Sequence, residues 1–239
     1  MNILIIQHAE FETAGAILPW AAERNHAVQV VHPYAGESLP EVHSFDMLIL
    51  LGGPMSVHDE ASLPWLVDEK RLTKDALESK RLVVGICFGS QILAEALGGK
   101  VFSNEDKEIG WHPIYRTMSF GSHRLLDAVP ELQSVFHWHG ETFSLPGGAL
   151  LVASSNCCTN QLFTYGTRAL GIQFHPEMTA EVVKAMCENC AEDLLEAPYV
   201  QSEEQMLSYP DRFVRNHKVL YDLFDGFVTG QPTTDQPAL

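Results

Sequence analysis

The stretch that most constrains the fold is LVVGICFGSQ at residues 82–91, in which an apolar run ends on a cysteine between two glycines. The pattern predicts a buried parallel strand, then a turn at Cys87, then a helix over residues 90–97. Gly85 and Gly89 leave room for so sharp a turn. The turn would hold the thiol above a sheet and at the N-terminus of a helix, a position that favours the thiolate form. We therefore predict a nucleophile elbow; an ordinary turn with a buried structural cysteine is the alternative.

Length and charge limit the class of protein. The 239 residues, of which 46% are hydrophobic, suit one large α/β domain or one domain with an appendage. Fifteen Lys and Arg against 31 Asp and Glu give a net charge of -16, which argues against a nucleic-acid partner. No stretch is apolar enough to span a membrane, and the N-terminal MNILIIQHAEF has no basic leader, so we expect no membrane partner and a cytoplasmic location.

The order of strand and helix patterns predicts the fold class. In the first half we expect strands at 2–7, 27–32 and 46–51, and helices at 13–25, with Thr13 as N-cap, and at 65–80. Short antiparallel strands are expected at 100–103, 111–118, 134–138 and 150–154, followed by a strand at 168–174 and helices at 179–195 and 211–227. The prediction is an α/β, flavodoxin-like doubly wound, mostly parallel sheet with a small antiparallel addition.

The chain divides into three expected parts. A main domain covers 1–195, and a connector with a C-terminal helix covers 196–229. The segment 230–239 has Pro and polar residues without periodicity and is expected to be a mobile tail.

Three of the expected strands end in residues that suit acyl-transfer chemistry. Open α/β sheets bind ligands at the carboxyl ends of their strands, where this chain has Gly52-Gly53-Pro54, Cys87 and His175-Pro176-Glu177. Cys87 is the candidate nucleophile, His175 the base that takes its proton, and Glu177 the carboxylate that orients the imidazole. Either flanking motif taken alone also fits an ordinary turn.

Backbone groups next to these side chains are the candidate oxyanion hole. The N–H of Phe88 follows the nucleophile directly, and a second N–H comes from the turn at Gly52 and Gly53. Glycines there also let the backbone approach a substrate closely, which makes Gly52 a candidate substrate-binding residue and Gly53 the second oxyanion donor.

Taken together, GGP, GICFGSQ and GIQFHPE resemble the class I, triad-type glutamine amidotransferase family. LGGPMSVHDE, EIGWHPI and ALGIQFHPE are similar to its stand-alone members related to the amidotransferase domain of GMP synthetase, and the resemblance runs from about Asn2 to Leu195. It implies a γ-glutamyl thioester on Cys87, and a role for Gln91 in holding the amino acid end of the substrate. His139 and Gly140 match a family segment that lines the glutamine pocket, and no cofactor is implied.

The substrate stays open. No phosphate-binding loop is present and no synthase domain follows Leu195, so we do not expect this chain alone to aminate a nucleotide. Either ammonia from glutamine passes to a separate synthase subunit, or the chain hydrolyses γ-glutamyl peptides such as glutathione. A regulatory module that keeps the fold without turnover is the alternative from another class.

Several other features suggest sites that we do not expect. His137 and His139 form an H-x-H pair, but without a carboxylate or Cys to complete a set we expect no metal. The five cysteines do not form a secreted disulfide framework, and Cys187-x-x-Cys190 and Cys157-Cys158 are expected to be structural. SNEDKE at 103–108 is expected to be a solvated loop, with recognition of an amine as the alternative.

Overall fold

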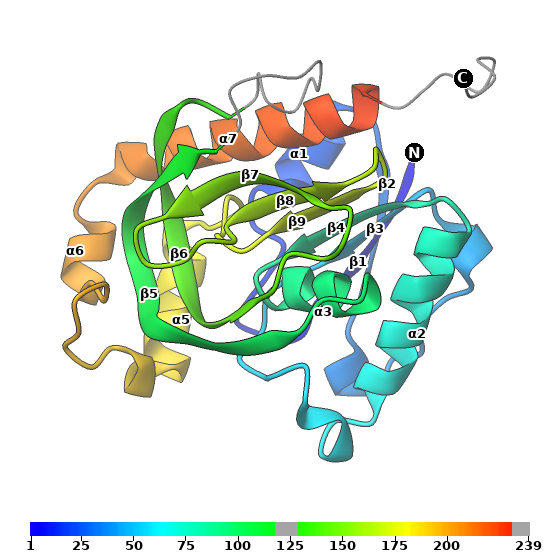
Figure 1. The fold of residues 1–239 in the computed structure, drawn as a ribbon, viewed down its shortest axis with the longest axis horizontal. Helices are drawn as coiled ribbons and strands as arrows, with labels where there is room; N and C mark the ends of the chain where they lie inside the picture. Colours follow the sequence, from blue (N-terminus) through cyan, green and yellow to red (C-terminus); the bar gives the residue numbers. More distant parts are fainter. Residues whose placement is uncertain (118–128, 231–239) are drawn as a thin grey trace.

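The computed structural model describes residues 1–117 and 129–230, which form a nine-stranded sheet with helices on both faces (Figure 1). Most of the expected tail, at 231–239, therefore lies outside the described residues. The strand order is β2-β1-β3-β4-β9-β8-β7-β5-β6. Among the described residues, no helix is both long and apolar enough to cross a membrane.

The first five strands of that order are parallel and confirm the doubly wound prediction. Their order corresponds to 2-1-3-4-5, the flavodoxin-like arrangement. Most of their residues are buried because helices cover both faces of the sheet, which explains their apolar runs without alternation. The five strands are β1 (Asn2–Ile6), β2 (Ala27–Val31), β3 (Met47–Leu50), β4 (Leu82–Ile86) and β9 (Ala169–Ile172).

The antiparallel addition continues the same sheet beyond β9. It consists of β5 (Val101–Arg116), β6 (Leu132–Phe143), β7 (Leu150–Ser155) and β8 (Leu162–Tyr165), of which β8 was not expected. The expected short strands at 100–103 and 111–118 do form β-structure from Val101 to Arg116, but they are parts of one long strand, β5, and residue 118 lies outside the described residues. The expected loop at 103–108 is wrong, since it lies within β5, where the register with β6 shifts between Ser103 and Glu108.

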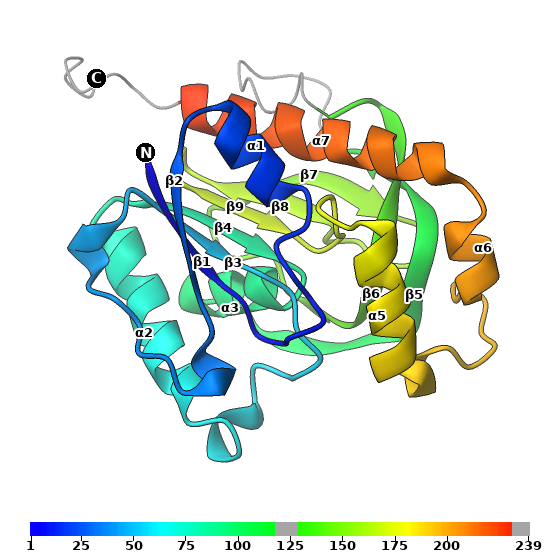
Figure 2. The same ribbon diagram turned by 180° about the vertical axis from the view of Figure 1, so that it is seen from behind.

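Helices α1 (Ile17–Glu23) and α7 (Pro210–Thr229) lie side by side over one face of the sheet (Figures 1 and 2). The ring of Trp20 meets that of Phe224 edge-on at 5.0 Å, so the C-terminal helix belongs to the main core. Helix α1 begins three residues later than expected, because Gly15 has φ of 45° and interrupts the helical run. Thr13 is therefore not its N-cap, which is Ala16.

Helices α2 (Trp65–Glu78) and α3 (Phe88–Ala96) cover the other face of the sheet. Helix α5 (Ala180–Asn189) packs with the short α6 (Glu203–Leu207) against β5 and β6, as Figure 2 shows from behind. Thr179 caps α5 by accepting a hydrogen bond from the N–H of Val182, and the helix ends six residues before the expected end.

Candidate active site

Cys87 stands on a strained turn between β4 and α3. Its φ of 49° and ψ of -110° lie in a region that residues with a side chain rarely adopt. A side chain on Gly85 would overlap the carbonyl oxygen of Gly89, and one on Gly89 would overlap that of Leu50. The two glycines are therefore required by close packing of α3 against the strands, as an elbow needs.

Neighbouring strands bring the predicted base to the thiol. Ile86 at the end of β4 pairs with Ile172 at the end of β9, and the N–H of Cys87 donates to the carbonyl oxygen of Ile172 at 2.7 Å. The strand β9 leads into His175, whose Nδ1 lies 2.8 Å from Oε1 of Glu177. Both side chains are buried, and Nε2 of His175 makes no hydrogen bond to another described residue. The geometry leaves Nε2 free to accept a proton.

The electrostatics of the thiol differ from the expectation. Burial raises the pKa of Cys87, and the neighbouring His175 only partly offsets this effect. The helix N-terminus therefore does not suffice to favour thiolate, and the thiol needs a base. Burial lowers the pKa of His175, but Glu177 and Cys87 together raise it well above its ordinary value, which makes His175 a strong base.

A cavity of about 310 Å³ opens beside the thiol and gathers most of the predicted site. Gly52 does not line the cavity, but a side chain on it would overlap Oε1 of Glu12, which does. His175 and Glu177 are buried and do not line the cavity. The predicted residues that line it are Gly53, Cys87, Phe88, Gln91, His139 and Gly140.

Two polar residues at the site were not expected. Glu12 follows β1 and lines the cavity, and its Oε1 lies 4.0 Å from Nδ1 of His175. Burial raises the pKa of Glu12 to about 7. Asn216 of α7 is fully buried and donates from Nδ2 to the carbonyl oxygen of His175 at 2.7 Å. Glu12 could have been found because it follows a parallel strand, and Asn216 because it interrupts the apolar face of a helix.

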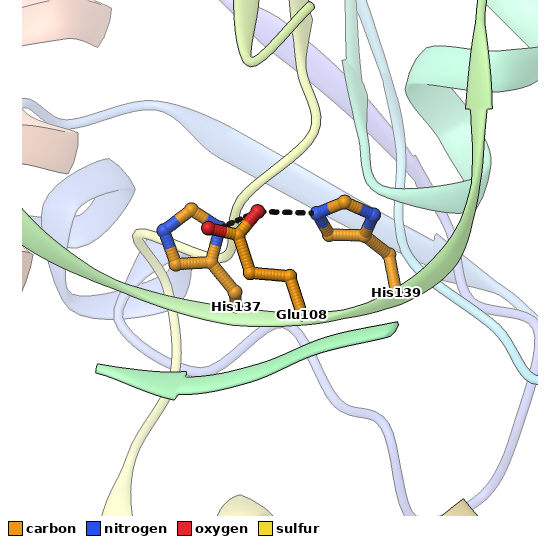
Figure 3. Close-up of side chains that lie close together, drawn as sticks. All are labelled: Glu108, His137 and His139. Carbon is orange, nitrogen blue, oxygen red and sulfur yellow. Dashed lines mark hydrogen bonds and ion pairs between the residues drawn. The ribbon is translucent and has the colours of Figure 1, made fainter. Parts of the chain in front are cut away.

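One cluster has side chains that can bind metal. Figure 3 shows Glu108 between His137 and His139, with Oε2 3.5 Å from Nδ1 of His137 and 3.2 Å from Nε2 of His139. The carboxylate that the sequence analysis found missing is thus supplied by β5. The same Oε2 accepts hydrogen bonds from Nε2 of Gln161 at 2.7 Å and from Oγ of Ser155 at 3.0 Å. Burial opposes ionisation of Glu108, but electrostatic interactions with His137 and His139 and the hydrogen bonds from His139 and Ser155 lower its pKa to about 2. Contacts within the cluster therefore account for the ionised carboxylate, and the absence of a metal stays a prediction.

Comparison with known proteins places the chain in a family. Residues 13–194 match the family model of class I glutamine amidotransferases. A glutamine amidotransferase-like protein of Salmonella typhimurium, YfeJ, is 34% identical over 216 residues, which cover 87% of this chain and 90% of that protein. The chain belongs to the class I glutamine amidotransferase family.

Solved structures of amidotransferases share the whole fold. That of a glutamine amidotransferase from Methylobacillus flagellatus has a TM-score of 0.88 at 29% identity and covers 99% of each chain. That of a glutamine amidotransferase from Thermotoga maritima has a TM-score of 0.85 at 30% identity and covers 95% of this chain and 98% of that one. GMP synthase of Pseudomonas aeruginosa is 32% identical in an alignment of 161 residues that covers 58% of this amidotransferase chain but only 29% of the synthase. The family match ends before α7, the helix that carries Asn216.

Proposed function

We propose that this class I glutamine amidotransferase hydrolyses the γ-glutamyl amide of glutamine through a thioester on Cys87. The observation that carries the proposal is the thiol on its strained turn beside a buried His175–Glu177 pair. Such a chain of nucleophile, base and carboxylate recurs in cysteine hydrolases on unrelated folds.

The proposed reaction has two steps. In the first, Sγ of Cys87 attacks the amide carbon while His175 takes the thiol proton, and the same proton leaves with ammonia. In the second, water loses a proton to His175 and attacks the thioester carbon, the C–S bond breaks to release glutamate, and His175 returns the proton to Sγ of Cys87. The N–H groups of Gly53 and Phe88 stabilise the oxyanion formed in each step. Gln91, His139 and Gly140 line the cavity beside the thiol and are the proposed contacts of the substrate's amino acid end.

Glutamine is the first candidate because the similar GMP synthase is named as glutamine-hydrolysing. If glutamine is the substrate, a separate synthase subunit that receives ammonia is the proposed partner. The second candidate is a γ-glutamyl peptide such as glutathione. The carboxylates of Glu12 and Glu141 line the same cavity as Cys87 and would attract a substrate that carries an ammonium group, which both candidates do.

The thioester itself tests the proposal. Intact mass is measured after incubation with glutamine and, separately, with glutathione, each stopped with acid. We expect a γ-glutamyl adduct on Cys87 from at least one of them and none on Cys87→Ala. An adduct from glutamine alone indicates ammonia release, and one from glutathione alone indicates a peptidase. If neither substrate gives an adduct, and the glutamine mimic 6-diazo-5-oxo-norleucine does not label Cys87, the protein binds without turnover and the proposal is wrong.

A further inference from the structure

We propose that His8, held by Glu69, is a positioning residue that fixes and polarises the Gly52–Gly53 peptide as an oxyanion donor. The inference rests on the proposed function, because an oxyanion donor matters only if an amide is cleaved. The residues of this pair were not among those that the sequence analysis singled out.

The hydrogen bonds of the imidazole define its role. His8 follows β1 and Gly52 follows β3, and these strands pair in register up to Ile6 and Leu50, so their ends lie together. Nδ1 of His8 lies 2.9 Å from the carbonyl oxygen of Gly52. A carbonyl oxygen only accepts hydrogen bonds, so Nδ1 carries a proton and donates it.

The other ring nitrogen fixes the imidazole from behind. Nε2 of His8 lies 2.8 Å from Oε1 of Glu69 on α2, and both side chains are fully buried. The pKa of His8 is raised, because Glu69 and the bond to Gly52 together outweigh burial, which lowers it. The charged groups that face the ring are Glu69 and, at longer range, Glu12. A buried ion pair contributes little net stability, so its value here is orientation.

The peptide transmits this contact to the cavity. The Gly52–Gly53 bond is trans, so the N–H of Gly53 points away from the carbonyl that His8 holds. Gly53 lines the cavity together with Cys87. A hydrogen bond to the carbonyl oxygen also polarises the peptide and strengthens its N–H as a donor. The His8 side chain is therefore placed to orient and activate the N–H of Gly53, a residue that lines the cavity.

The ring also contacts the second proposed donor. It meets the ring of Phe88 edge-on at 4.9 Å and stacks on Trp65 at 5.8 Å with an interplanar angle of 13°. A side chain on Gly53 would come within 2.9 Å of Cβ of His8, so the turn and the imidazole fit tightly. His8 thus contacts both of the residues whose N–H groups form the proposed oxyanion hole.

Two amide substitutions separate the roles of the two ring nitrogens. In His8→Asn the side-chain N–H₂ takes the place of Nδ1 and can still donate to the carbonyl oxygen of Gly52. In His8→Gln the side-chain N–H₂ takes the place of Nε2 instead and can reach only Glu69. Loss of one oxyanion donor lowers kcat about 10²- to 10³-fold. We therefore expect His8→Gln to lower kcat by about 10²-fold with KM nearly unchanged, and His8→Asn to keep kcat within about tenfold of the wild type.

The outcomes are distinct. Equal kcat losses in the two variants, or a His8→Gln variant with wild-type kcat for glutamine or glutathione, would overturn the proposal. Thermal unfolding of both variants serves as a check on folding. A loss of kcat that follows the loss of stability in both variants would show a merely structural role.

A second readout does not depend on turnover. In protein with nitrogen-15-labelled glycine, the amide resonance of Gly53 reports the hydrogen bond to the preceding carbonyl. We expect it to shift in His8→Gln more than in His8→Asn. If wild type turns over neither substrate, the proposed function fails while this shift still supports the contact; an unchanged Gly53 resonance in His8→Gln overturns the inference itself.

Discussion

Asn216 donates a 2.7 Å hydrogen bond from its side-chain amide to the main-chain carbonyl oxygen of His175. Nε2 of the adjacent His217 lies 2.7 Å from the carbonyl oxygen of Met178. On the other side, the N–H of Ala16 donates a 2.9 Å hydrogen bond to the carbonyl oxygen of Glu177. The loop that carries the proposed base and its carboxylate is therefore held by α7 on one side and by the start of α1 on the other. Helix α7 supports the site although it lies outside the family match.

Asn216→Ala tests this support. It leaves a buried carbonyl oxygen without its donor, so we expect the free energy of unfolding to fall by about 1–3 kcal/mol and kcat to fall with it. Val214 on the same helix is 70% exposed, and Val214→Ala should change the unfolding free energy by less than about 0.5 kcal/mol. Urea unfolding and steady-state kinetics of both variants are the measurements. A similar effect of both substitutions would contradict the contact's importance.

Glu177→Gln should move the pH dependence of turnover. Glu177 raises the pKa of His175 by stabilising the imidazolium, so removing the charge lowers that pKa and neutral imidazole persists to lower pH. We expect the acid limb of kcat/KM to shift to lower pH and kcat to fall about 10²- to 10⁴-fold, because the amide does not orient the ring correctly. A pH profile with the acid limb unmoved or shifted upward would exclude this role of Glu177.

Glu12→Gln should change how stability depends on pH. Burial raises the pKa of Glu12 from its ordinary 4.5 to about 7 in the folded protein. Between these two pKa values the carboxyl of Glu12 keeps its proton in the folded state but has lost it in the unfolded state. The free energy of unfolding therefore falls as the pH rises, by up to about 3 kcal/mol. Glu12→Gln removes that loss, so we expect the variant to be more stable than the wild type at pH 7.5 and similar at pH 4.5. Urea unfolding of both proteins at the two pH values is the measurement. A difference in unfolding free energy between variant and wild type that is the same at both pH values would contradict the prediction.

Cys87→Gly and Cys87→Ala should differ in stability. Both lose the thiol, but only glycine relieves the strain of φ 49° at this turn. We expect Cys87→Gly to unfold at higher urea concentration than Cys87→Ala, by at least about 1 kcal/mol. Equal stability of the two inactive variants would mean that the turn stores no strain.

The candidate residues that the sequence indicates are those whose signal is local. A strand that ends on Gly-Ile-Cys-Phe-Gly or His-Pro-Glu marks a sheet edge, and the observed strand order brings Cys87 and His175 to the same edge. Contacts from distant elements had no such signal. Glu108 was assigned to a loop because its neighbours are polar, but cross-strand pairing places it opposite His139. Asn216 and the pair of His8 and Glu69 depend on how helices pack on the sheet, which periodicity alone does not determine.

The pairing of β4 with β9 determines when, during synthesis and folding, Cys87 first meets its proposed base. The chain between them forms all four antiparallel strands, so the nucleophile is synthesised long before the strand that leads into its base. Contacts this distant in sequence form late, because loop closure must precede them. A nascent chain that ends before Ala169 carries Cys87 as an ordinary thiol, without a neighbouring imidazole. The alkylation rate of this one cysteine would therefore report, during synthesis or refolding, the moment at which the sheet closes.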